Sequence, residues 1–267
     1  VYNYTLIATD ADSNTTSQAV VVTVTDVNEV PTAISLSPNT IAENVTVGAG
    51  VEIGTLTVTD PDASGNNNGL TLSGADADSF AIVEGKLMFR GSSPNFEAKS
   101  SYNVTVTSTD CCLGKSQVFT VNVTDVNEAP TLTASATNSP FTEGAGAAVS
   151  VFSGAAVSTV DAGQLINGLS FTVSGLADGT NEKLTIDGST IELTAGNNLT
   201  STTNGMSINV GSVTNGTTTV TLSKVAGISA AGAATLITGI KYQNTNVDNP
   251  TAGNRVFTLT QVTDTGS

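Results

Sequence analysis

The sequence contains no histidine and no tryptophan, and only 8 of its 267 residues are lysine or arginine. Without histidine, the chain lacks the side chain that most often acts as a general base and that most often binds transition metals. A hydrolase would then need a carboxylate pair or a serine–lysine arrangement. The few lysine and arginine residues are scattered along the sequence, and no glycine-rich phosphate loop follows a predicted strand. We therefore expect that the protein is not an enzyme.

Cysteine is almost absent too, since Cys111 and Cys112 are the only two and are adjacent. This spacing does not fit a zinc site. A vicinal disulfide, a link to another chain and two free thiols all remain open. No apolar stretch is long enough to cross a bilayer, so we expect no membrane insertion. Nothing at Val1 resembles a signal peptide, but the chain begins within a predicted strand, so this observation says nothing about secretion.

Acidic residues outnumber basic ones by 23 to 8, which gives a net charge of -15. Such a chain repels phosphate backbones, so we expect no nucleic-acid partner. Aromatic residues make up only 4%, and the cores must be built mostly from Val, Leu, Ile and Ala. The abundance of Thr, Val, Ser, Gly, Asn and Asp favours strands joined by polar turns.

An octapeptide repeats almost unchanged 99 residues apart, at 25–32 and at 124–131, and differs at one position. It is rich in oxygen ligands and carries a proline that cannot donate to a sheet, which is typical of a joint between domains. The strand patterns before it also repeat, at 2–10 and 102–110. We therefore predict three parts: the last two strands of a repeat at 1–30, a complete repeat at 31–129, and a longer unit at 130–267 that lacks its last strand. Either the chain is a window of a longer array, or the ends of neighbouring chains complete one another.

Period-2 alternation predicts an all-β fold of tandem Greek-key β-sandwiches arranged end to end. In the complete repeat the expected strands are 33–37, 52–59, 70–73, 80–83, 86–89, 103–108 and 117–124. In the longer unit they are 168–174, 183–186, 190–193, 206–210, 218–222 and 255–260. One helix is expected over 229–239, with Ser229 as N-cap, packed over an end of the sandwich.

Oxygen-bearing side chains recur in the loops at the two ends of the complete repeat. A hard cation such as calcium needs six to eight oxygens, and several loops that meet at a joint can supply them. A single Asp or Asn is more often a turn residue, but the full ordered set between residues 43 and 128 favours a metal-binding role. The predicted metal ligands are Asp26, Asn28, Glu29, Glu43, Asp60, Asp62, Glu97, Asp110, Asp125, Asn127 and Glu128.

The order of these motifs resembles the cadherin repeat. The residues that carry the likeness are Ala42-Glu43-Asn44, Thr59-Asp-Pro-Asp62, Phe80-Ala-Ile-Val-Glu-Gly-Lys-Leu87, Asn95-Phe-Glu97, Thr109-Asp110 and Asp125-Val-Asn-Glu-Ala-Pro130. The likeness covers 31–129 fully and 1–30 for the part present, and the joint variant looks most like bacterial cell-surface adhesins. It departs from the family at Asn95, where the family has Asp, and at Glu29 and Glu128, where animal members have Asp.

The resemblance implies two calcium-binding joints. The joint near residue 125 would take Glu43, Glu97, Asn127 and Glu128, and the joint near residue 26 would take Asn28 and Glu29 with Asp60, Asp62 and Asp110. The unit at 130–267 resembles a different, long immunoglobulin-like bacterial surface repeat, through 176–188 and 240–245. Calcium candidates there are Glu143 and Asp161.

These observations predict an extracellular, cell-surface segment that binds Ca²⁺ and acts as a stiff adhesive or spacer rod. Its partners would be calcium ions and other protein chains, through like-repeat contacts or a cell-surface ligand. Two other functions stay open. The first is a subunit of a self-assembling filament or surface layer, completed by strand exchange between neighbours. The second is a carbohydrate-binding sandwich, which would need a row of exposed aromatic residues.

Overall fold

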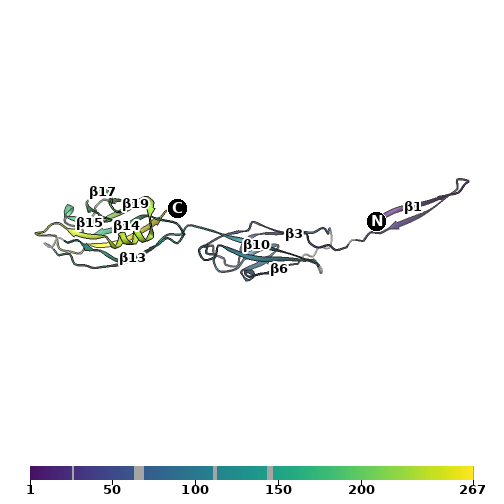
Figure 1. The fold of residues 1–267 in the computed structure, drawn as a ribbon, viewed down its shortest axis with the longest axis horizontal. Helices are drawn as coiled ribbons and strands as arrows, with labels where there is room; N and C mark the ends of the chain where they lie inside the picture. Colours follow the sequence, from purple (N-terminus) through teal and green to yellow (C-terminus); the bar gives the residue numbers. More distant parts are fainter. Residues whose placement is uncertain (26, 63–68, 111–112, 143–146, 267) are drawn as a thin grey trace. The chain divides into compact units, whose positions relative to one another are not determined.

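The computed structural model describes residues 1–25, 27–62, 69–110, 113–142 and 147–266 (Figure 1). Strands dominate these residues, as the sequence predicted, with one α-helix and two short 3₁₀ turns. The chain divides into two compact units, Val1–Asp125 and Val126–Ser267. Each unit has a hydrophobic core of its own.

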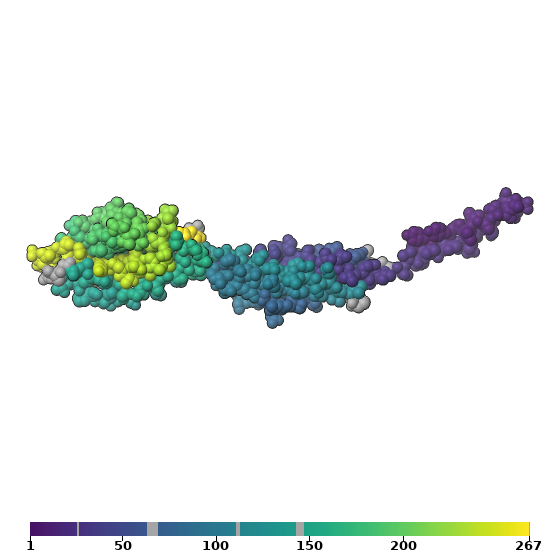
Figure 2. Space-filling model, in the orientation of Figure 1, coloured from purple at the N-terminus to yellow at the C-terminus, as the bar shows by residue number. Residues whose placement is uncertain are grey.

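The first unit begins with a two-stranded antiparallel hairpin, β1 (Tyr2–Thr9) and β2 (Thr15–Val22). Asp10 closes the turn, because its carboxylate accepts hydrogen bonds from the side chain and the backbone of Asn14, and these hold the pKa of Asp10 below its ordinary value. Every residue of both strands is exposed, including Tyr2, Tyr4 and Leu6 (purple in Figure 2). Two strands alone cannot bury an apolar face.

The rest of the first unit is a sandwich of two four-stranded sheets. One sheet has the order β4-β10-β9-β6, in which β4 runs parallel to β10, and the other has the order β3-β5-β8-β7. The strands are β3 (Ala33–Ser37), β4 (Thr40–Ala42), β5 (Val51–Thr59), β6 (Gly69–Ser73), β7 (Phe80–Val83), β8 (Lys86–Phe89), β9 (Ser101–Asp110) and β10 (Leu113–Thr124). Alternate residues of β9 and β10 point inward, so Val104, Val106 and Val121 are fully buried.

The second unit is a larger sandwich. Its five-stranded sheet has the order β17-β18-β19-β14-β21, a four-stranded sheet has the order β12-β20-β15-β16, and β11 pairs with β13. The strands are β11 (Thr131–Ala136), β12 (Val149–Ser150), β13 (Phe152–Ser158), β14 (Ile166–Ser174), β15 (Glu182–Ile186), β16 (Ser189–Glu192), β17 (Asn198–Thr200), β18 (Ser207–Val210), β19 (Thr218–Ile228), β20 (Lys241–Asn244) and β21 (Val256–Asp264). Phe171, Leu184 and Ile208 are fully buried in its core.

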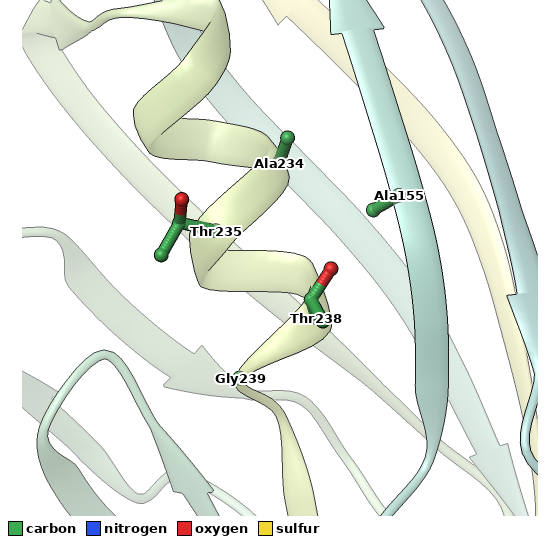
Figure 3. A pocket seen from close by; sticks show the side chains of 5 residues that line it. All are labelled: Ala155, Ala234, Thr235, Thr238 and Gly239. Carbon is green, nitrogen blue, oxygen red and sulfur yellow. The ribbon is translucent and has the colours of Figure 1, made fainter.

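The helix α1 (Ala230–Thr238) confirms the predicted N-cap, because the Ser229 hydroxyl accepts a hydrogen bond from the Gly232 amide at 3.0 Å. Ala233, Leu236 and Ile237 form its buried face. The helix packs against β13 and not over an end of the sandwich, which corrects the sequence expectation. A hollow of about 420 Å³ between them is lined by Ala155, Ala234, Thr235, Thr238 and Gly239 (Figure 3). These side chains are small and uncharged.

Replacing Ser229 by alanine is expected to lower the free energy of unfolding of the second unit by about 1 kcal/mol, because the Gly232 amide loses its acceptor. Urea denaturation followed by circular dichroism would measure the loss. Ser229→Asp should restore most of it, since aspartate caps equally well. Ser223→Ala, at an exposed position of β19, is the matched control. An equal loss in both alanine variants would contradict the capping role.

Candidate metal centres

The strand β9 fixes the positions of the predicted ligands in the first unit. Its ten residues rise by about 3.3 Å each, so the strand extends for about 30 Å along the sandwich. Glu97 lies in the loop that leads into β9, and Asp110 is its last residue. The predicted acids therefore separate into two clusters, one at each end of β9.

The first group, here called the entry cluster, consists of Asp60, Asp62 and Asp110. Each offers one carboxylate oxygen, and these three oxygens lie within 4.8 Å of one another. Asp60 and Asp62 directly follow β5, and Asp110 ends β9, so two neighbouring strand ends bring the three together. Asp62 and Asp110 are buried, at 8% and 2% exposure. The Asp62 amide donates to Asp60 Oδ1 at 3.1 Å, which holds the Asp-Pro-Asp loop closed on itself.

The joint before the sandwich reaches this cluster through Glu29. Its backbone amide donates to Asp62 Oδ2 at 3.0 Å, so the repeated octapeptide is tied to the entry cluster by its main chain. Asn28 and the Glu29 side chain are exposed. Asp26, also a predicted ligand, lies outside the described residues.

The second group, here called the exit cluster, consists of Glu43, Glu97 and Asp125. Their carboxylates also offer three oxygens within 4.8 Å of one another. Glu43 is buried at 2% exposure, and its Oε2 accepts a hydrogen bond from the Phe96 amide at 2.7 Å. The Glu43 amide in turn donates to the Thr124 carbonyl at 3.1 Å. The loop before β9 and the end of β10 are thereby both anchored on Glu43.

The remaining predicted ligands, Asn127 and Glu128, belong to the second unit. The Glu128 amide donates to Asp161 Oδ2 at 3.1 Å, which repeats the Glu29–Asp62 contact 99 residues later. Gln164 donates to the same Asp161 oxygen at 2.7 Å, and 2.8 Å separates the facing side-chain amides of Asn127 and Gln164. Asp161 is therefore the structural counterpart of Asp62. Glu143, the other candidate in this unit, lies outside the described residues, as do Cys111 and Cys112.

The chemistry of the two clusters in the first unit fits a hard divalent cation. Oxygens that contact one calcium ion at about 2.4 Å can lie no more than about 4.8 Å apart, and the three oxygens of each cluster meet that limit. All the ligand atoms in these two groups are carboxylate oxygens, which bind calcium or magnesium in preference to softer metals. Three carboxylates supply at most six oxygens, so each site also has places for backbone carbonyls, amide oxygens or water.

The sequence did not predict a buried ionic network in the second unit. The Arg255 side chain is 7% exposed, and it donates from Nε to Glu182 at 2.5 Å and from a terminal nitrogen to Asp178 at 3.2 Å. The Tyr242 hydroxyl donates to the same oxygen, Glu182 Oε1, at 2.9 Å. Burial and the Glu182 charge raise the pKa of Tyr242. Burial raises the pKa of Asp178, but hydrogen bonds from Thr251 and Asn244 and the Arg255 charge outweigh it, so this pKa lies below its ordinary value. The charged and polar groups of this network bind one another, and we therefore assign the network a structural role.

No helix among the described residues has the length and apolar character needed to cross a bilayer.

No protein-family model matches the chain, and no curated protein sequence matches it either. Among solved structures, the chain is similar to a protocadherin gamma B7 fragment at 26% identity and a TM-score of 0.43, over 64% of this chain and 43% of the other. The protocadherin gamma B4 extracellular domain gives 24% identity and 0.45, over 62% and 28%. Human protocadherin-24 gives 15% identity and 0.36, over 88% and 95%. The chain thus spans less than half of the first two structures, and TM-scores below 0.5 do not establish a shared fold over the whole chain.

Proposed function

We propose that the chain is an extracellular, calcium-binding tandem-repeat segment that acts as a stiff adhesive or spacer rod. One observation carries the proposal: a single sandwich holds a cluster of three carboxylates at each end of the same strand, β9. An enzyme or a ligand-binding domain would gather its acids in one cleft. Acids at both ends of a sandwich suit a domain that joins to a neighbour on each side.

Charge repulsion supplies the mechanism. At an effective dielectric constant of about 20, two carboxylate charges about 4.8 Å apart repel each other by roughly 3 kcal/mol. Three such groups therefore favour an open arrangement of the loops that carry them. A bound divalent cation reverses the sign of this interaction and draws the loops together, so that the loops order when the ion binds.

The proposed ligands at the entry cluster are Asp60, Asp62 and Asp110, completed by Asp26, Asn28 and Glu29 of the preceding joint. Those at the exit cluster are Glu43, Glu97 and Asp125, completed by Asn127 and Glu128 of the following joint. The contact between the Glu29 amide and Asp62 supports the first assignment, because it ties the joint to the cluster. In this proposal the joints are flexible without calcium and rigid with it. The rod then holds an adhesive surface, formed by like repeats or by a distal domain, away from the cell.

Calcium titration calorimetry combined with small-angle scattering tests the proposal. The intact chain should bind at least two calcium ions. Its maximum dimension should increase with calcium, and the distribution of its dimensions should become broad again in EGTA. Glu43→Gln/Glu97→Gln should remove binding at the exit cluster, and Asp60→Asn/Asp62→Asn should remove it at the entry cluster.

The matched control is Glu52→Gln/Asp78→Asn, which removes two exposed charges that belong to neither cluster. It should bind calcium as the parent chain does. Unchanged scattering and no binding heat in the parent chain would contradict the proposal, and so would equal losses in the control.

A further inference from the structure

A bulge in β19 directs one lysine toward an asparagine of a neighbouring loop. Ser223 and Ile228 of β19 pair with β14 residues that are only two positions apart, so the residues between them bulge out of the sheet. Val225, within this bulge, is 98% exposed. Lys224 is only partly exposed, and its Nζ donates a hydrogen bond to the backbone carbonyl oxygen of Asn204 at 2.5 Å. The bulge therefore places a primary amine against Asn204.

The side chain of Asn204 is held by a buried carboxylate. Its Nδ2 donates to Asp187 Oδ1 at 2.6 Å, and its backbone amide donates to Asp187 Oδ2 at 3.0 Å. Asp187 is 8% exposed, and the hydroxyl of Ser201 also donates to its Oδ2, at 2.5 Å. Because two groups of Asn204 bond to one carboxylate, the orientation of the side-chain amide is fixed.

The turn between β15 and β16 brings Asp187 to this loop. Asp187 and Gly188 form the two-residue turn with φ angles of 50° and 79°, which is typical of a type I′ turn with the sequence Asp-Gly. A Cβ at Gly188 would lie 2.6 Å and 2.5 Å from the hydroxyl oxygens of Thr202 and Thr203. Glycine thus permits the close approach of the loop that carries Asn204. The turn, the loop and the β19 bulge meet at one place in the second unit.

We propose that Lys224 and Asn204 form an intramolecular amide bond and that Asp187 carries the proton which the reaction requires. The chemical groups of a transamidation meet here: an amine, a side-chain amide and a carboxylate that contacts the leaving nitrogen. Lys224 contacts the main-chain carbonyl oxygen of Asn204. Three covalent bonds separate that carbonyl carbon from Cγ of the same residue, so the carbon to be attacked is close to the amine.

The reaction balances without an oxidant, a reductant or a cofactor. The Lys224 ammonium loses a proton to solvent, because only the neutral amine is a nucleophile. The lone pair of Nζ attacks Asn204 Cγ, and the π electrons of the side-chain carbonyl move to its oxygen. Asp187 Oδ1 takes a proton from Nζ, which is now bonded to the same carbon as Nδ2, and passes this proton to Nδ2. The carbonyl re-forms, the Cγ–Nδ2 bond breaks, and ammonia leaves.

The product closes a covalent ring over β18 and most of β19. Ser207 lies opposite Ser223 in this pair of strands, so the new bond lies beside the first hydrogen-bonded residues of β18. Unfolding can then no longer separate the two strands from this end. Lys224, Asn204 and Asp187 belong to neither the entry cluster nor the exit cluster. The inference is therefore independent of calcium binding, and the bond should form equally in calcium and in EGTA.

Mass spectrometry of the intact chain and of its tryptic peptides tests the proposal. The intact mass should be lower than the sequence mass by one molecule of ammonia. Trypsin cleaves only after lysines with a free side chain, so cleavage after Lys183 and Lys241 should release one peptide, 184–241. This peptide should be uncleaved after Lys224 and should lack one ammonia. The full sequence mass together with cleavage after Lys224 would overturn the proposal.

A succinimide at Asn204 gives the same mass change, because the amide of Gly205 can attack the same carbon. That product leaves Lys224 free, so loss of ammonia together with cleavage after Lys224 would also overturn the proposal.

Three variants assign the roles. Lys224→Arg keeps the charge and should abolish the loss of ammonia, whereas Lys241→Arg, at an exposed position of β20, should retain it. Asp187→Asn should lower the cross-linked fraction at least tenfold, with circular dichroism to confirm that the variant is folded. Persistence of the mass change in Lys224→Arg would contradict the bond, and an unchanged fraction in Asp187→Asn would contradict the role of the carboxylate.

Discussion

Replacing Arg255 by methionine is expected to lower the free energy of unfolding of the second unit by about 3 to 5 kcal/mol. The substitution removes the cation from a group in which the Asp178 side chain is 6% exposed and the Glu182 side chain is 1% exposed. Two carboxylates then remain buried without their counter-charge, and the cost of that desolvation is no longer offset. Urea denaturation at pH 7, followed by circular dichroism, would measure the change.

The control is Lys183→Met, because Lys183 forms an ion pair with Glu192 at the surface, at 3.3 Å and with both side chains partly exposed. Surface pairs contribute only about 0 to 1 kcal/mol, so this variant should unfold almost as the parent does. A loss below about 1 kcal/mol for Arg255→Met would mean that the network does not stabilise the unit.

The same network predicts acid sensitivity of the second unit. The folded-state pKa of Asp178 lies below its ordinary value of 3.8, so the carboxylate contributes stability that is fully present above the unfolded pKa. That contribution is lost as the pH falls through the folded pKa. Thermal melts between pH 7 and pH 2 should therefore show a decrease that begins near pH 4. Asp178→Asn should flatten this decrease, and an unchanged profile would contradict the assignment.

Calcium is expected to raise the free energy of unfolding of the first unit by about 1.4 to 2.7 kcal/mol for each occupied cluster. These values follow from 10 mM free ion and from dissociation constants of about 10⁻⁴ to 10⁻³ M, which are typical of extracellular modules. Two occupied clusters would then contribute about 3 to 5 kcal/mol. The measurement is urea denaturation with calcium or with EGTA at constant ionic strength.

Two variants locate this effect. Asp62→Asn should remove the stabilisation that calcium gives at the entry cluster, and Glu43→Gln should remove that at the exit cluster. Each variant should therefore show about half of the calcium-induced increase in the free energy of unfolding. Magnesium at the same concentration is the ion control, and it should have a smaller effect because it requires a tighter octahedron. An increment that survives both substitutions together would place the calcium elsewhere.

The sequence predicted the fold best where alternation was clear. β3, β7 and β8 have the predicted bounds, since Ile34 and Leu36 alternate with serines in β3 and the turn at Gly85 separates β7 from β8. β13 was not predicted, because Phe152-Ser-Gly-Ala-Ala-Val-Ser158 is made of small residues with little contrast between its faces. β12 and β17 were too short to show a period.

The candidate metal sites could be predicted from the sequence because each acid lies at the end of a strand or in a short loop beside one. Asp60, Asp62 and Asp110 then meet wherever the ends of β5 and β9 meet. Arg255 and its partners could not be predicted in this way, since 73 to 77 residues separate the arginine from Glu182 and Asp178. No local spacing marks such a contact. Only the folded sheets bring β15 and the residue before β21 together.

The parallel pairing of β4 and β10 has a mechanical consequence for a molecule that carries tension. Thr40, Ile41 and Ala42 lie beside Asn122, Val123 and Thr124, so the second and the last strand of this sandwich run side by side in the same direction. A pull that reaches β4 and the end of β10 slides these strands past each other, and every hydrogen bond between them is loaded at once. Strands that peel apart break their bonds one after another and yield at a lower force. The sandwich would therefore hold its shape under stretching loads that open a simple hairpin such as β1–β2.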